Sequence, residues 1–371
     1  MDFTFSPEQE DLRAAVRQTL EREAGPAYVR RMMDDDRGVD EGLWRTFADL
    51  GWLGVLVPAE HGGLGLGLVD AVVVQQEMGR LPLPGPYFSS AVLATLAARA
   101  LGADALLGGL ASGARRGTLA VEEWGSGDPL DAVATTATRS SSGDTWVLDG
   151  LKPLVLDAHV ADWAIVVARD TSVDGDGGLA GFLVESPAAH ATVVPALDVT
   201  RKTCRLELDG VTATRLGPPG DQRALWRRVL DDAAIALCAE TLGACEAAQA
   251  MAVDYATHRV QFDRPIGSFQ VIRHKLVDML HEITLAQVGV HWAAWASDVD
   301  DPEREHAAAM CKSFVGAASV FVTAENIQVH GGVGFTWDVD AHLYYRRVKQ
   351  NDALLGPTGW QRARLADLVL D

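Results

Sequence analysis

Cysteine is scarce in this chain of 371 residues, which contains only four. They lie at Cys204, Cys238, Cys245 and Cys311, without the CxxC spacing that marks many zinc sites. Scattered cysteines in a chain of this length also give no sign of a disulfide framework. We therefore expect no metal site, no disulfides and a reducing compartment.

Positive charge is also in short supply. The 32 Lys and Arg residues face 51 Asp and Glu residues, for a net charge of −19, and no stretch concentrates the basic ones. This excludes nucleic acid and anionic membrane surfaces as natural partners. The N-terminus lacks the basic and apolar regions of a signal peptide, and the most apolar windows, 88–101 and 233–253, are too short or interrupted to span a bilayer. We expect a cytoplasmic protein.

The pattern of apolar residues changes twice along the chain, which is long enough for two or three domains. Residues 1–117 show helical spacing, beginning at the Ser6 cap and Pro7. Residues 118–220 contain short strand-like runs, such as 132–138 and 163–168, separated by turn residues. Residues 221–371 return to a helical period with long helices. The sequence thus predicts an α+β multidomain fold, with a small sheet or barrel between two helical domains.

A glycine-rich segment at 61–67 superficially resembles a phosphate-binding loop. It follows helical sequence, however, with no preceding strand and no Lys-Ser/Thr pair, so the context of a P-loop or Rossmann turn is missing. A structural turn is the better interpretation.

Two later motifs are more informative. The segment 328–336 ends a long helix with Gln328 followed by the paired Gly331 and Gly332, which would let the backbone approach a flat or charged ligand. A plain helix C-cap explains the glycines equally well. The segment 258–270 joins two long helices and contains arginine, phenylalanine and glutamine, suited to phosphate oxygens and a ring system. A solvated helix connector is the alternative for any one of its residues.

Taken together, segments 58–65, 259–270 and 328–334 resemble, in order and spacing, the acyl-CoA dehydrogenase family, and the likeness runs from about residue 3 to 366. The resemblance implies an N-terminal α-helical domain (1–117), a middle β-barrel domain (118–220) and a C-terminal four-helix bundle (221–371). It also implies a tetramer with FAD at subunit interfaces, an acyl-CoA substrate dehydrogenated at its α,β bond, and an electron-transferring flavoprotein as acceptor. The positions that match family contacts to a neighbouring chain's FAD are Arg259, Phe262, Gln270, Gln328, Gly331 and Gly332.

The catalytic base of the family is missing from its usual position. Arg346 and Gly356 fix the register, and the glutamate position is Leu355, which cannot accept a proton. Some members carry the base on the first helix of the C-terminal domain, which falls near Ala233 in this chain. Asp232, with Asp231 beside it, and Glu240 are therefore weak candidates, although each residue also has a structural interpretation.

The middle domain departs from the family as well. The Thr-Glu-Pro strand appears as 122–124, beginning with Glu122, and the aromatic and hydroxyl positions of a second turn are Leu154 and Leu156. Contacts to the chain's own flavin are thus altered, whereas contacts to a neighbour's flavin are kept. We interpret the chain as a β-type subunit of an α2β2 heterotetramer, of the kind known in actinobacterial steroid and side-chain degraders. The alternatives are a self-sufficient homotetramer with a displaced carboxylate base, and a flavoprotein of this fold with other chemistry.

Overall fold

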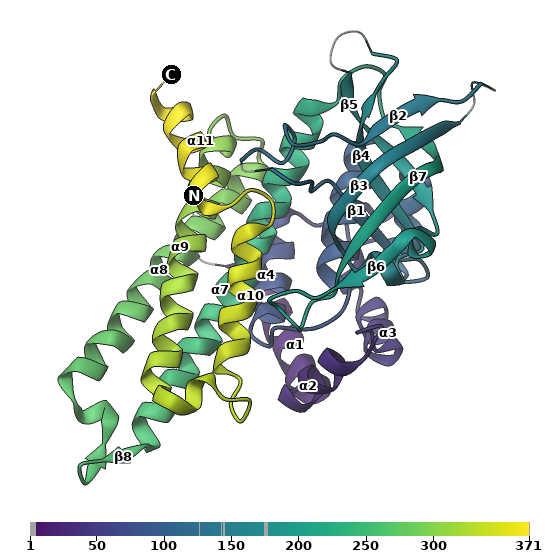
Figure 1. Ribbon diagram of the computed structural model, residues 1–371. Helices are drawn as coiled ribbons and strands as arrows, with labels where there is room; N and C mark the ends of the chain where they lie inside the picture. Colours follow the sequence, from purple (N-terminus) through teal and green to yellow (C-terminus); the bar gives the residue numbers. More distant parts are fainter. Residues whose placement is uncertain (1–4, 126, 142, 144, 174–176, 371) are drawn as a thin grey trace.

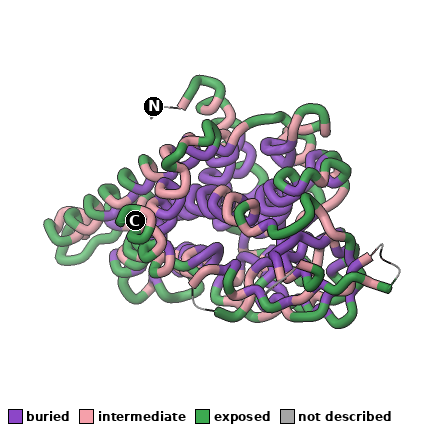
Figure 2. Tube along the Cα trace, turned by 90° about the horizontal axis from the view of Figure 1, so that it is seen from above, coloured by how far each residue is buried: buried purple, intermediate pink, exposed green. Residues whose placement is uncertain are grey.

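The structure, a computed structural model, describes residues 5–370 except 126, 142, 144 and 174–176 (Figure 1). An N-terminal group of helices and a β-barrel lie against a bundle of long C-terminal helices (Figure 1). Buried segments gather where these parts meet, and the exposed ones form the periphery (Figure 2).

The N-terminal part is helical, as the sequence predicts. Its elements are α1 (Pro7–Glu23), α2 (Pro26–Asp34), α3 (Glu41–Asp49), α4 (Leu68–Gly79), the π-helix η3 (Tyr87–Ala94), α5 (Thr95–Ala100) and α6 (Leu107–Ala111). The expected cap at Ser6 is a complete capping box, in which the Ser6 hydroxyl accepts from the Gln9 N–H and the Gln9 side chain accepts from the Ser6 N–H. The glycine-rich segment after residue 58 is a turn that folds back, with Leu64 N–H donating to Gly54 O at 2.8 Å.

The middle part is a closed barrel. Its strands are β1 (Gly117–Ala120), β2 (Thr136–Arg139), β3 (Trp146–Leu156), β4 (Trp163–Asp170), β5 (Gly178–Glu185), β6 (Ala191–Val194) and β7 (Thr203–Leu216). The strands pair in the order β4-β2-β3-β7-β5, and the sheet closes into a barrel because β5 also pairs with β4. Strand β1 pairs with β4, and β6 pairs with β7. Closure removes most unpaired strand edges, and a separate apolar core fills the interior.

The C-terminal part begins with α7 (Arg223–His258), followed by the short hairpin β8 (Val260–Gln261) and β9 (Arg264–Pro265). It continues with α8 (Gln270–Asp298), α9 (Arg304–His330), α10 (Ala341–Ala353) and α11 (Thr358–Leu370). Within the described chain, one helical stretch, 304–335, is long and apolar enough to cross a membrane, but it is largely buried among its neighbours. Its composition is that of a central core helix.

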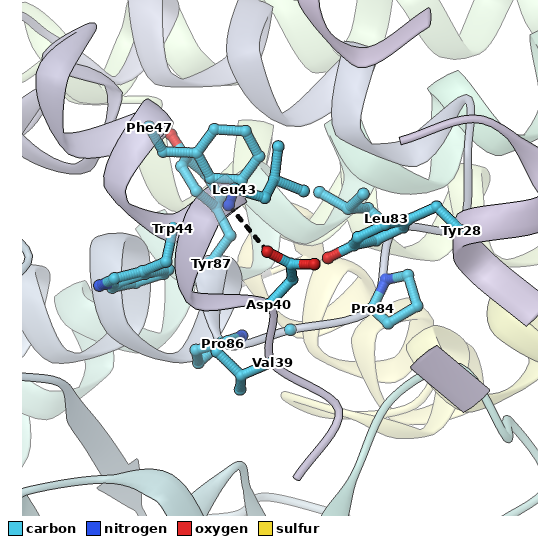
Figure 3. A pocket seen from close by; sticks show the side chains of 11 residues that line it. Tyr28, Val39, Asp40, Leu43, Trp44, Phe47, Leu83, Pro84, Pro86 and Tyr87 are labelled. Carbon is cyan, nitrogen blue, oxygen red and sulfur yellow. Dashed lines mark hydrogen bonds between the residues drawn. The ribbon is translucent and has the colours of Figure 1, made fainter. Parts of the chain in front are cut away.

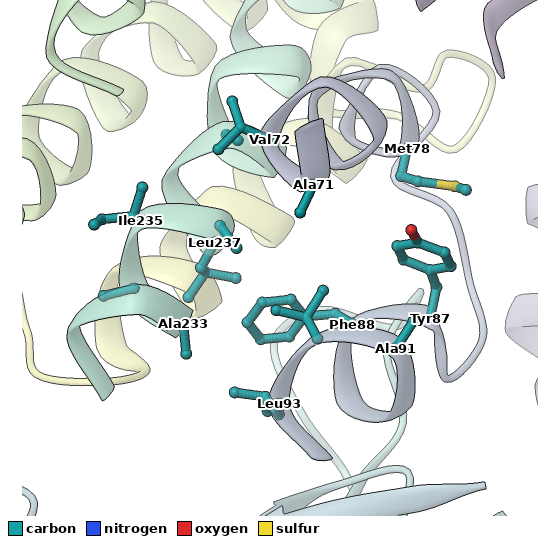
Figure 4. Packing of buried hydrophobic residues seen from close by; sticks show 14 of the residues in the cluster. Ala71, Val72, Met78, Tyr87, Phe88, Ala91, Leu93, Ala233, Ile235 and Leu237 are labelled. Atoms are coloured by element: carbon teal, nitrogen blue, oxygen red, sulfur yellow. The ribbon is translucent and has the colours of Figure 1, made fainter. Parts of the chain in front are cut away.

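The N-terminal and C-terminal helical parts meet where the backbones of α4 and α7 pack very closely against each other. A Cβ added to Gly79 would lie 1.8 Å from Glu240 O, and one added to Gly243 would lie 1.8 Å from Gln76 O. Only glycine permits this approach. Beside the crossing, apolar side chains of α4, η3 and α7 pack together, among them Phe88 and Leu237 (Figure 4).

The structure differs from the sequence analysis in local detail. The strand expected at 132–138 is only Thr136–Arg139, because 128–133 forms turns and loop instead. The helical spacing of residues 1–117 did not indicate that η3 would be a π-helix or that α2 would form a separate helix. Tertiary packing decides all three segments, because tertiary context overrides local propensity.

Candidate functional site

A small pocket in the N-terminal domain can be set aside first. It lies between α2, α3 and residues 83–87, with aromatic rings around Asp40 (Figure 3). Its volume is about 10 Å³, room for no more than a single water molecule. The carboxylate of Asp40 caps α3 through the Gly42 and Leu43 N–H groups. This is a structural feature and not a ligand site.

The positions at which we expect the chain to depart from the family line a second cavity. Its walls come from η3, the end of β1, the end of β3 and the turn after α10. The residues that line it are Phe88, Leu93, Leu119, Val121, Glu122, Leu154, Leu156, Leu354 and Leu355. Leu355, Leu154, Leu156 and Glu122 are therefore brought together from segments far apart in sequence.

Glu122 is the one titratable residue among the described residues that line this cavity. Its carboxyl accepts a hydrogen bond of 2.8 Å from the Leu355 N–H. Burial raises the pKa of Glu122 above its usual range, although this hydrogen bond and the charges of Lys312 and Lys152 oppose the shift. Sequence reasoning did not single out Glu122 as a candidate, because no spacing relates it to Leu355.

The cavity does not fit a flavin ring. Its volume is about 20 Å³, enough for about one water molecule, because leucine side chains fill the space. Two ion pairs, Asp128 with Arg227 and Asp131 with Arg223, also connect the loop between β1 and β2 to α7 of the C-terminal domain. We derive no chemical step at this cavity.

The two carboxylates considered as displaced bases do not line this cavity. Glu240 lies on α7 in a buried ion-pair cluster, 2.8 Å from Arg347 Nη1 and 2.7 Å from Arg201 Nη2. Burial works against its charge, but the two guanidinium groups lower the pKa of Glu240 below its usual range. An ionised carboxylate held by two arginines is a structural partner, and the geometry gives no support to its role as a base.

Asp232 lines a different cavity, of about 340 Å³, together with Arg99, Arg228 and Asp298. It accepts a hydrogen bond from the Ser297 hydroxyl, and burial raises the pKa of Asp232 to about 6. Its neighbour Asp231 is bound by both terminal nitrogens of Arg364, at 2.5 and 2.8 Å. Neither aspartate lines the Leu355 cavity.

The six residues expected to reach a neighbour's flavin have a different environment. All are exposed, and Phe262 is 85% exposed. They lie at the end of the bundle where α7 and α9 finish and α8 begins, which is also where the β8–β9 hairpin projects (Figure 1). The ion pair between Lys275 of α8 and Glu325 of α9, at 2.6 Å, holds two of these helix ends together.

This end of the bundle fits a dinucleotide presented from outside. Within the described chain, the side chains of Arg259 and Gln328 have no hydrogen bond or ion pair, so they are free to bind a ligand. A guanidinium group suits phosphate oxygens, and the exposed backbone of Gly331 and Gly332 leaves room for a close approach. The described residues contain no group of three or more His, Cys, Asp or Glu that could hold a metal ion.

Comparison with known proteins identifies the class to which this geometry belongs. Residues 6–106, 118–211 and 223–370 match the N-terminal, middle and C-terminal domains of acyl-CoA dehydrogenase, respectively. The chain therefore belongs to the acyl-CoA dehydrogenase family, whose members are FAD-dependent oxidoreductases acting on CH–CH bonds.

Among its relatives is "Acyl-CoA dehydrogenase IpdE2" of Mycolicibacterium smegmatis, 31% identical over 97% of this chain and 98% of that protein. The solved structure "Tcur3481-Tcur3483 steroid ACAD G363A variant" is 32% identical, with a TM-score of 0.86 and 98% of each chain covered. The ChsE4-ChsE5 complex from Mycobacterium tuberculosis is 28% identical, with a TM-score of 0.87, and covers 100% of this chain and 99% of that one.

Proposed function

We propose that this chain is the subunit without a catalytic base in a heteromeric acyl-CoA dehydrogenase of α2β2 composition, and that it completes the FAD site of a base-bearing partner. One observation carries the proposal. The departures from the family line a single cavity too small for a flavin, whereas the kept positions form an exposed surface at another place in the fold.

In this proposal the division of labour follows from the chemistry of the residues. When bound, FAD supplies the hydride acceptor for α,β-dehydrogenation of an acyl-CoA thioester. The partner supplies the carboxylate that removes the α proton. This chain supplies the Arg259 guanidinium, the Gln270 and Gln328 amides and the Gly331–Gly332 backbone, which bind the partner's FAD and take no part in proton transfer.

A second surface supports assembly with a homologous subunit. Along α8, the side chains of Val277, Leu280, Leu285 and Val288 are exposed. An apolar cavity of about 420 Å³ lies between α8 and α9 on the same face. Exposed apolar patches of this kind mark protein interfaces. Two of the similar structures are named as pairs of proteins, which is the assembly proposed for this chain.

The relatives suggest the remaining details of the proposal. A similar structure is named as a steroid enzyme, so a steroid-derived acyl-CoA is the substrate we propose. We place the complex in the cytoplasm and assign an electron-transferring flavoprotein as its electron acceptor, as is usual in the family.

The test is the flavin content of the chain purified alone and together with a base-bearing acyl-CoA dehydrogenase subunit, from the absorbance near 450 and 280 nm. We expect little flavin in the chain alone, and one flavin per pair of chains with turnover in the complex. One flavin per chain with turnover in the absence of a partner would overturn the proposal.

A second candidate function, a self-sufficient homotetramer, is favoured by one observation. Glu122 places a carboxyl beside Leu355, where the family has its base. In that case Glu122→Gln would abolish turnover of the chain alone, while Asp232→Asn and Glu240→Gln would serve as comparisons. Turnover that survives Glu122→Gln would remove this candidate.

A further inference from the structure

Two segments at the exposed end of the bundle carry the residues assigned to the partner's flavin. The first limb, residues 259–270, follows α7, and the second limb, residues 328–335, consists of the last residues of α9 and the 3₁₀ turn Gly331–Phe335 after it. A ring pair joins them: Tyr255 of α7 stacks on His330 of α9, with ring centroids 4.3 Å apart and planes inclined by 24°. Tyr255 lies one helical turn before the first limb, and His330 lies within the second limb.

The first limb packs against the last turns of α7, next to Tyr255. The Arg259 N–H donates to Tyr255 O at 2.8 Å, and the Ile266 N–H donates to Arg259 O at 2.8 Å. A Cβ added to Gly267 would come within 2.9 Å of Ala256 O, so the limb folds back tightly on the last turns of α7.

The second limb is built on His330 in the same way. A Cβ added to Gly334 would come within 2.9 Å of His330 Cβ, so the limb folds back tightly against the base of the His330 side chain. His330 Nδ1 lies 2.8 Å from Asn326 O, and because a carbonyl only accepts, Nδ1 is the protonated nitrogen. His330 is 6% exposed, and its hydrogen bond and ring stack hold the imidazole in place.

We propose that Tyr255 and His330 are a positioning pair that sets the spacing between the two limbs and so determines the affinity for the partner's FAD; this inference rests on the proposed function. Helix ends fray unless they are held, and a ligand that must order two limbs binds more weakly than one that meets them already placed. The pair holds the ends of α7 and α9 against each other before any ligand arrives. His330 touches no reacting atom, so its role is positioning and not proton transfer.

The test uses the complex with a base-bearing partner subunit and compares His330→Ala with His330→Phe, and Tyr255→Leu with Tyr255→Phe. We expect the Ala and Leu variants to weaken FAD binding about 3- to 10-fold, the range that a ring stack contributes. The Phe variants keep a ring, so their affinity for FAD should stay within about twofold of that of the original chain. The KM for acyl-CoA, measured at saturating FAD, should not change. His190→Ala, an exposed histidine on the barrel, is the matched control.

Hydrogen exchange of the chain alone gives a readout that needs no partner. In His330→Ala, amides of both limbs should exchange faster, while barrel amides and the thermal midpoint stay close to those of the original chain. Faster exchange in neither limb, or in the second limb alone, would overturn the proposal.

Arg259→Ala and Gln328→Ala separate this inference from the function on which it rests. If neither of these changes weakens FAD binding in the complex, the proposed function fails. If they weaken it and His330→Ala does not, or if His330→Phe weakens it as much as His330→Ala, the positioning role of the pair is refuted while the proposed function stands.

Discussion

The carboxyl of Glu122 accepts a hydrogen bond from the backbone N–H of Leu355, with 2.8 Å between Oε1 and N. Leu355 itself has a left-handed backbone, with φ of 60°, and follows the last turn of α10. The middle domain thus fixes the turn that contains Leu355, where we propose that the family's base is replaced. This hydrogen bond holds the cavity wall in place whether or not chemistry occurs there.

Substitution of Glu122 tests whether its role is that hydrogen bond or its charge. Burial raises the pKa of Glu122, so a neutral amide should replace the carboxyl well. We expect Glu122→Gln to change the free energy of unfolding by less than about 1 kcal/mol. Glu122→Ala leaves the Leu355 N–H without its acceptor and should cost about 1–3 kcal/mol. Chemical denaturation measures both, and equal effects of the two changes would contradict this account.

If the proposed function holds, a carboxylate introduced at position 355 should not create a second active site. Leu355→Glu places a carboxyl in an apolar cavity of about 20 Å³ that leaves no room for a flavin. We expect the turnover per complex to stay the same as in the original, and burial of the new carboxyl to lower the thermal midpoint. Leu355→Gln is the control for the added bulk and polarity. A doubling of turnover in Leu355→Glu alone would show that this cavity is catalytically competent.

The raised pKa of Asp232 should make the stability of the chain depend on pH. Its pKa is raised by burial from 3.8 to about 6, so the folded chain holds this proton more tightly than the unfolded chain does. Its contribution to stability is therefore full below pH 4 and is lost as the pH rises through 6. Relative to the original chain, Asp232→Asn should gain up to about 3 kcal/mol on going from pH 4 to pH 7.

Urea denaturation of both chains at pH 4, 5, 6 and 7 gives this difference directly. The Asn side chain keeps an oxygen that can accept from the Ser297 hydroxyl, so the comparison isolates the charge. If the difference in unfolding free energy between the two chains does not vary with pH, the pKa of Asp232 is not raised.

Arg347 joins all three parts of the molecule. Its buried guanidinium bonds Asp198 at 2.5 Å after β6, Glu240 at 2.8 Å on α7, and the Pro82 carbonyl at 3.1 Å before η3. Removing one partner of a buried ion pair leaves unpaired charge, so we expect Arg347→Met to cost about 3–5 kcal/mol of unfolding free energy.

The neighbouring Arg346 is the control for Arg347. It is less buried and makes a hydrogen bond of 3.2 Å to Leu197 O. We expect Arg346→Met to cost less than about 1.5 kcal/mol. Similar losses for the two variants in thermal and chemical denaturation would refute the special role of Arg347.

Local signals in the sequence predicted much of the fold correctly. The capping box at Ser6 and the apolar spacing that follows it mark α1, because both are properties of residues three or four apart. The barrel was expected from short strands, but its closure through the β4–β5 pairing was not visible, since that depends on partners chosen in three dimensions. The segment at 132–138 was misjudged because its β-branched residues favour a strand that tertiary packing does not form there.

For the candidate site, the sequence by itself determined which residue types are present: no carboxylate at Leu355, leucines at 154 and 156, and at Arg259 and Gln328 the types expected for flavin contacts. Only the tertiary structure decided what these residues do together. It brings Glu122, Leu154, Leu156 and Leu355 to one small cavity, and it encloses Glu240 between two arginines. These partners are separated by tens to hundreds of residues, and contacts at such separations follow from the packing of whole domains, which no local pattern encodes.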